Sequence, residues 1–140
     1  MTPTQSTSST VAREGTGILR TLQVLAALTV LELLVQYLSA GQMLGPLHSR
    51  TAREIHESGA IVLHVVSGLT AVAAILLWRT RRTSVWPAVL SVLVFVLSFL
   101  QAYLGDDETL YLHIPGALVL TVGSVWVLVW SLSPWAARAD

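Results

Sequence analysis

Four long apolar runs dominate the chain, and they restrict it to a fold that lies in a membrane. The runs cover residues 18–40, 57–78, 85–104 and 110–132, and each is close to the roughly 20 residues that a helix needs to cross a bilayer. Lipid cannot hydrogen-bond to backbone N–H and C=O groups, so runs of this length must be helical. Only 11 % of the residues are charged, against about 25 % in soluble domains. The sequence predicts an all-α, four-helix transmembrane bundle in the lipid bilayer.

The segments outside the four runs are short. Residues 1–17 are rich in Ser and Thr and lack apolar periodicity, so we expect a disordered tail there. A transmembrane domain over residues 18–133 and a short tail over residues 134–140 follow. The first run is longer than the apolar core of a signal peptide, which has about 7–15 residues, and it contains Glu32 and Gln36. We therefore interpret it as a helix of the mature protein.

The arginines predict the orientation of the bundle. All basic residues are Arg, and the two in the loop after the first run are Arg50 and Arg53. The others flank the opposite helix ends, at Arg13, Arg20, Arg79, Arg81, Arg82 and Arg138. Cytoplasmic flanks carry the excess of positive charge, so we expect a multi-pass protein of the cell membrane with both termini in the cytoplasm. The net charge is zero, which argues against a nucleic-acid partner.

Two of the runs begin with related octets. HESGAIVL starts at His56 and HIPGALVL starts at His113, and five of the eight positions are identical. Upstream of each octet, Gln36 and Gln101 stand near the end of the preceding run, each followed by a nearby Tyr. The likeness indicates an internal repeat. It predicts two similar helical hairpins related by a pseudo-two-fold axis along the membrane normal.

This repeat places His56 and His113 opposite each other at the outer end of the bundle. Neutral imidazole is a common axial ligand of haem iron, and a haem takes one such ligand on each side. Gly59 and Gly116 follow the histidines by three residues on nearly the same helix face, where a macrocycle could lie against the backbone. The pattern predicts a haem b with His56 and His113 as its metal ligands. The alternative is that both histidines only cap their helices at the water boundary.

Other polar residues near this end are weaker candidates for the same binding site. Arg50 and Arg53 could pair with the propionates of a haem. His64 competes with His56 as the ligand from the second helix, but its counterpart in the repeat is Thr121, which favours His56. His48 has no counterpart, and we expect it to be an ordinary exposed histidine. The chain has no cysteine, so covalent c-type attachment of a haem is excluded.

A second polar group lies deeper in the bilayer. Glu32 and His64 both stand about 10–12 Å below the outer ends of their helices, at a rise of 1.5 Å per residue. Because an intramembrane carboxylate normally finds a partner, we expect a Glu32–His64 hydrogen bond. Gln36 and Gln101 extend this polar strip outward. The strip is interpreted either as a proton path or partner of a cofactor, or as interhelical hydrogen bonding that only locks the bundle.

This pattern resembles the small four-helix membrane cytochromes b, and in particular one half of haem A synthase. In that family, histidines at the outer starts of the second and fourth helices hold a haem. His56 in REIHESG and His113 in LHIPG stand at the matching places. The chain departs from the family in having one bundle, no loop cysteines and an unusual spacing of its acid, Glu54, before the ligand. The resemblance implies a haem b carrier, sensor or electron-transfer protein rather than a full haem A synthase.

Three functions remain open on these residues. The first is electron transfer from a quinol or another membrane redox protein to an acceptor at the outer face. The second is a cofactor-free accessory subunit or interaction protein within a larger membrane complex. The third is a proton-coupled carrier that uses Glu32 and His64, although no helix has the paired Gly/Pro interruptions of transporters. No short catalytic motif is present.

Overall fold

A computed structural model describes residues 5–44, 48–81 and 83–137. These residues form helices and contain no strand. The helices are α1 (Gln5–Leu44), α2 (Arg50–Arg81), α3 (Trp86–Tyr103), α4 (Leu110–Leu132) and the short α5 (Pro134–Ala137). The first four are long and apolar enough to cross a membrane. The chain is therefore an integral membrane protein built as an all-α bundle, as the four apolar runs predict.

Two helices are longer than the apolar runs that define them. α1 begins at Gln5, so the part of the expected disordered tail that the structure describes is helical. No Gly or Pro stands between Gln5 and Glu14 to interrupt the helix, and residues 1–4 lie outside the described part. α2 begins at Arg50, seven residues before the expected start, because the Ser49 hydroxyl accepts a hydrogen bond from the Ala52 N–H at 3.2 Å. A serine at this position caps a helix start.

The helices of the second hairpin, α3 and α4, begin and end close to the apolar runs that predict them. α3 has Pro87 in its first turn, where the missing N–H costs nothing and the fixed φ suits a helix. α4 covers the expected residues, and Pro134 follows its end. Pro115 lies inside α4 near its start. The loop of residues 104–109 is short, so α3 and α4 are antiparallel neighbours.

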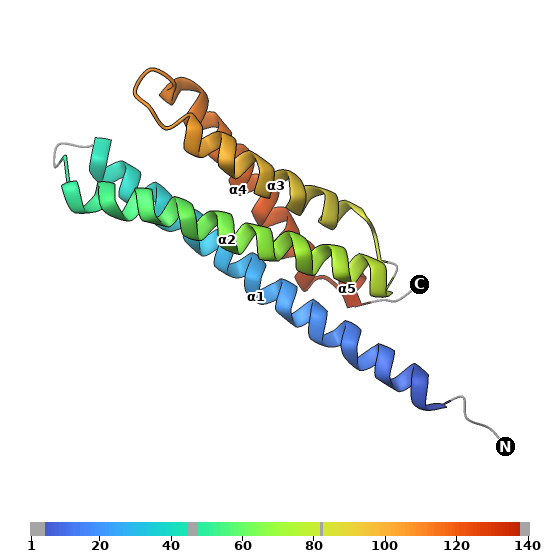
Figure 1. The fold of residues 1–140 in the computed structure, drawn as a ribbon. Helices are drawn as coiled ribbons and strands as arrows, with labels where there is room; N and C mark the ends of the chain where they lie inside the picture. Colours follow the sequence, from blue (N-terminus) through green and yellow to red (C-terminus); the bar gives the residue numbers. More distant parts are fainter. Residues whose placement is uncertain (1–4, 45–47, 82, 138–140) are drawn as a thin grey trace.

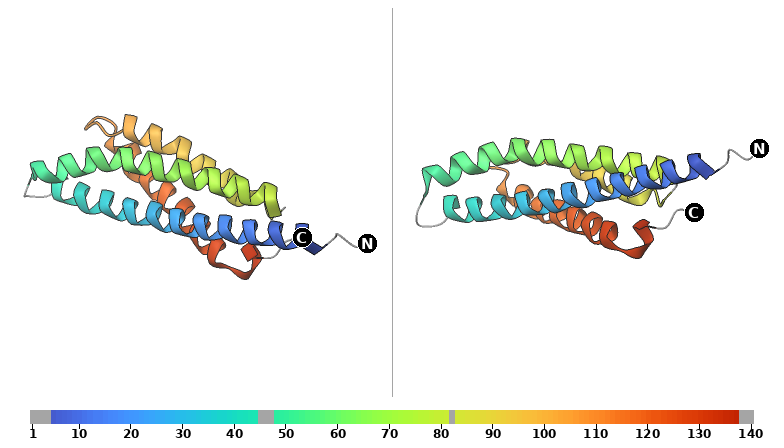
Figure 2. Two further views of the ribbon diagram at one scale, coloured as in Figure 1. Left: turned by 60° about the horizontal axis from the view of Figure 1, so that its bottom comes forward. Right: turned by 90° about the horizontal axis from the view of Figure 1, so that it is seen from below.

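The helices form a four-membered ring of antiparallel neighbours (Figure 1). α1 packs against α2 and α4, and α3 packs against the same two helices, so α2 and α4 stand diagonally across the bundle. The N- and C-termini lie at the same end (Figures 1 and 2), which we call the terminal end. The opposite end carries both hairpin loops and is called the histidine end. The two hairpins diverge toward the histidine end (Figure 1).

The apolar core occupies the terminal end and the middle of the bundle. One cluster of buried residues includes Leu22, Leu77 and Val127 near the terminal end. A second cluster is centred on Leu33 and Leu120 farther along. Large apolar side chains also cover the outer surface of all four long helices, as expected for a bundle whose solvent is lipid.

The side-chain packing follows the internal repeat. Corresponding positions are 65 residues apart in α1 and α3 and 57 residues apart in α2 and α4, which are the separations within the Gln36/Gln101 and His56/His113 pairs. A small cavity at the middle of the bundle is lined by four pairs at these separations, namely Ala26 and Ser91, Thr29 and Val94, Ser67 and Ser124, and Thr70 and Val127. Equivalent residues of the two hairpins therefore meet around one axis, which supports the duplication that the octets indicate.

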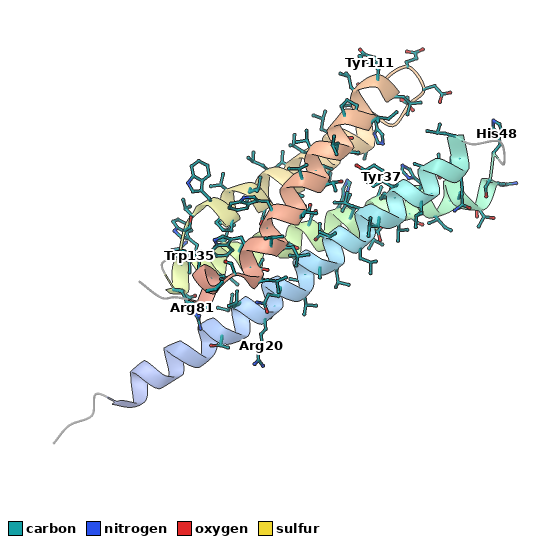
Figure 3. All side chains as sticks on the ribbon, turned by 180° about the vertical axis from the view of Figure 1, so that it is seen from behind. Arg20, Tyr37, His48, Arg81, Tyr111 and Trp135 are labelled. Atoms are coloured by element: carbon teal, nitrogen blue, oxygen red, sulfur yellow. The ribbon has the colours of Figure 1, made fainter. Side chains whose placement is uncertain are left out.

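Aromatic residues mark the two ends. Tyr103 and Tyr111 are 79 % and 72 % exposed near the histidine end, and Trp86 and Trp135 are 66 % and 67 % exposed near the terminal end. Figure 3 shows Tyr111 and Trp135 at opposite ends of the bundle. Amphipathic rings at both ends suit the two membrane–water interfaces.

Candidate functional site

The two repeat histidines lie next to each other at the histidine end. His56 extends from α2, almost two turns after the helix begins, and His113 extends from the first turn of α4. Their ring centroids are 6.3 Å apart, and the ring planes are tilted by 57°. Both side chains are partly buried. Two diagonal helices from different hairpins thus bring one imidazole each to a shared place.

Each imidazole is oriented by a backbone carbonyl of the neighbouring helix. The Nδ1 atom of His56 lies 3.2 Å from the Gln36 carbonyl oxygen, and that of His113 lies 2.8 Å from the Gln101 carbonyl oxygen. A carbonyl only accepts hydrogen bonds, so His113 donates from Nδ1, and His56 does the same in the tautomer that bonds to the Gln36 carbonyl. A neutral imidazole then keeps a lone pair on Nε2, the nitrogen that can bind a metal. Among the described residues, neither Nε2 has a hydrogen-bond partner.

The carbonyl acceptors are available for local reasons. α3 ends at Tyr103, so the Gln101 carbonyl belongs to the last helical turn, whose carbonyls have no partner within the helix. The Gln36 carbonyl lies inside α1 and accepts from the Ser39 hydroxyl as well as from His56. Ser39 Oγ is itself 3.1 Å from His56 Nδ1. These bonds join each histidine to the other helix of its own hairpin.

A glutamine side chain lies against each of the two octet glycines, Gly59 and Gly116. A Cβ atom at Gly59 would overlap the Gln36 amide and the Glu32 carboxylate, and a Cβ at Gly116 would overlap the Gln101 amide. The absence of a side chain therefore lets the glutamines lie against α2 and α4. This is a different use of the two glycines from the contact with a macrocycle that the sequence suggests.

Glu32 and His64 do not pair with each other. Glu32 Oε1 accepts a hydrogen bond from Gln36 Nε2 at 2.9 Å, one turn along the same helix. The His64 ring packs edge-on against Phe99 of α3, with ring centroids 4.0 Å apart, and its buried Nδ1 has no hydrogen-bond partner. The expected Glu32–His64 hydrogen bond is thus absent, because α2 turns His64 toward α3 while Glu32 lies on the α2-facing side of α1. Gln101 Oε1 is also buried without a partner.

The charged residues near the site are exposed. Arg50 Nε lies 3.5 Å from Glu54 Oε1, and these side chains are 91 % and 66 % exposed. Such pairs contribute little to stability. Arg53 is exposed three residues before His56 and so on a similar face of α2. His48 is exposed in the loop between α1 and α2 and has a positive φ of 42°.

Two contacts at this end were not expected from the sequence. Ser39 bonds to His56, and the Tyr37 hydroxyl lies 3.1 Å from Thr121 Oγ1 of α4. The repeat gives one sequence signal for Thr121. It corresponds to His64 of the first hairpin, so both α2 and α4 carry a polar residue at this position.

The number of side chains that could bind a metal distinguishes a site for a bare ion from a site for a haem. No group of three or more His, Cys, Asp or Glu side chains that could hold a metal ion is found in the part of the chain that the structure describes. A bare ion would therefore have two imidazoles from this set, whereas protein sites for zinc typically supply three or four ligands. A haem brings its own equatorial nitrogens and needs only axial ligands from the protein. Comparisons with protein-family models, curated proteins and solved structures find no match for the chain.

Proposed function

We propose that the protein binds one haem b between His56 and His113 and transfers electrons within the membrane. The observation that carries the proposal is the 6.3 Å between the two ring centroids. A metal–nitrogen distance of about 2.1 Å, and about 1.2 Å from that nitrogen to the ring centroid, would place two axial imidazoles about 6.6 Å apart. The histidines are therefore already near the separation that a shared iron requires.

The orientation of the rings supports the same proposal. Both Nδ1 atoms are held by backbone carbonyls, and this second bond to a ligating histidine fixes the tautomer and the ring direction. Arg53 is the exposed cation on a similar face of α2 and is proposed to pair with a propionate.

The chemistry that follows is one-electron transfer, which the haem would supply when bound. The chain contributes the two ligands, the acceptors that orient them and the apolar bundle that holds them in lipid. We propose a membrane quinol or another membrane redox protein as the electron donor. With both termini in the cytoplasm, as the arginines predict, the histidine end would meet its acceptor at the outer face.

The test is expression in a haem-producing host and purification in detergent, followed by haem quantification, metal analysis and a reduced-minus-oxidised spectrum. We expect one non-covalent haem b per chain and a low-spin spectrum. Copper or zinc bound without porphyrin would replace the proposal with a bare-ion site. Protein that carries neither porphyrin nor metal, even after incubation with hemin, would refute it.

A further inference from the structure

Glu32 breaks the symmetry of the site. The glutamines and histidines of the two hairpins correspond, but the position equivalent to Glu32 in α3 is Leu97. Glu32 is partly buried, accepts a hydrogen bond from Gln36 Nε2 and lies against Gly59 of α2. Only the first hairpin therefore adds a carboxylate to its glutamine–histidine pair.

This carboxylate is linked to His56 through a single residue. Gln36 donates its side-chain N–H to Glu32 Oε1 and accepts the Nδ1 hydrogen of His56 at its backbone carbonyl. Gly59, which contacts the carboxylate, is one helical turn from His56. An ionisable group at this depth is costly and usually serves a function. Its place beside the histidine pair points to a role in the charge balance of the site.

On the basis of the haem proposed above, we infer that Glu32 is a proton-binding site coupled to the redox change. If a haem held by His56 and His113 took up one electron from the donor, Glu32 would bind one proton from water, which would form the O–H bond of its carboxylic acid. Oxidation returns the electron to the acceptor and the proton to water. Reduction removes one positive charge from a region of low dielectric, where charges interact strongly. Proton uptake at Glu32 removes one negative charge in the same step.

The other titratable groups on the packed helices do not bond to Glu32. α1 packs against α2, α4 and, at its terminal end, α5, and α5 has no titratable side chain. The charged or titratable side chains toward the histidine end of α2 and α4 are Arg50, Arg53, Glu54, His56, Glu57, His64, Tyr111 and His113. Within the described residues, Glu32 has no hydrogen bond or ion pair with any of them. In the described part of the chain, the Glu32 carboxylate has one hydrogen-bond partner, the side chain of Gln36.

The test is a redox titration of the haem-loaded protein at several pH values. A tenfold change in proton concentration corresponds to about 59 mV for a one-electron couple. We expect the midpoint potential of the wild type to fall with rising pH by up to that amount per pH unit. In Glu32→Gln the potential is expected to be independent of pH, and to exceed that of the wild type at high pH because the negative charge is absent. Glu57→Gln, which removes an exposed carboxylate beside His56, is expected to keep the wild-type slope.

Two further measurements separate proton binding from a structural role. An infrared difference spectrum should show a carboxylic-acid band on reduction of the wild type, and this band should be absent in Glu32→Gln. The double variant Glu32→Leu/Leu97→Glu moves the acid to the equivalent place beside Gln101 and should restore the slope. A flat wild-type potential, or an unchanged slope in Glu32→Gln, would overturn this inference while the haem proposal stands. A wild type that binds no haem would overturn both.

Discussion

Gly59→Ala is expected to destabilise the bundle by about 1–2 kcal/mol, although alanine is the better helix former. Replacing a glycine inside a helix contributes about 0.5–1 kcal/mol to stability. At Gly59, however, the new Cβ would overlap both Gln36 Nε2 and Glu32 Oε1, so the ends of both side chains must shift, and we expect this shift to disrupt their 2.9 Å hydrogen bond. A hydrogen bond to a charged group is worth about 1.5–3 kcal/mol. The loss therefore exceeds the gain.

Two other glycines serve as matched controls. Gly41 lies in α1 with no atom near the place of a Cβ, so Gly41→Ala is expected to stabilise the protein by about 0.5–1 kcal/mol. Gly116→Ala meets only the Gln101 amide. That side chain has an unpartnered Oε1 and is free to turn away, so we expect little net change. The same substitution should thus have three different effects.

Equilibrium unfolding in mixed detergent micelles, monitored by far-ultraviolet circular dichroism, measures the three differences. The expected order of stability is Gly41→Ala, then the wild type and Gly116→Ala close together, then Gly59→Ala. If Gly59→Ala were as stable as Gly41→Ala, displacing Glu32 and Gln36 from α2 would cost no stability, and the reasoning would be refuted.

Two further predictions concern the packing and the topology. Gly123 is buried against Val94, whose β-branched side chain cannot easily move. Gly123→Ala is therefore expected to lower the unfolding free energy by about 1–3 kcal/mol through overpacking. A stability equal to that of Gly41→Ala would contradict this helix contact. The chain has no cysteine, so single substitutions report topology directly. In intact cells an impermeant thiol reagent should label Asp107→Cys and spare Ser84→Cys, and the reverse pattern would invert the predicted orientation.

The parts of the fold that follow from the sequence are those that a membrane imposes. Apolar length predicts the four spans, because lipid leaves a helix as the only way to satisfy the backbone. The helix ends are harder to predict, since polar segments can continue a helix into water. α1 therefore begins at Gln5 and α2 at Arg50, well outside their apolar runs.

The candidate site is predictable in part for a similar reason. The repeat predicts that His56 and His113 come together, because duplicated hairpins place equivalent residues around a common axis. Nothing in a single sequence determines how far each helix rotates about its own axis. His64 consequently contacts Phe99 instead of Glu32. Gln36 lies one turn from Glu32 on the same helix, so the hydrogen bond between them does not depend on how the helices are rotated relative to one another.

The most direct test of the proposed site is the low-spin absorption spectrum of the ferric protein with each histidine replaced in turn. We expect His48→Gly to leave a bis-imidazole spectrum unchanged. His56→Gly and His113→Gly should each abolish it, and free imidazole, which can occupy the vacated ligand position, should restore it. If both variants keep the low-spin spectrum without added imidazole, His56 and His113 are not the axial ligands.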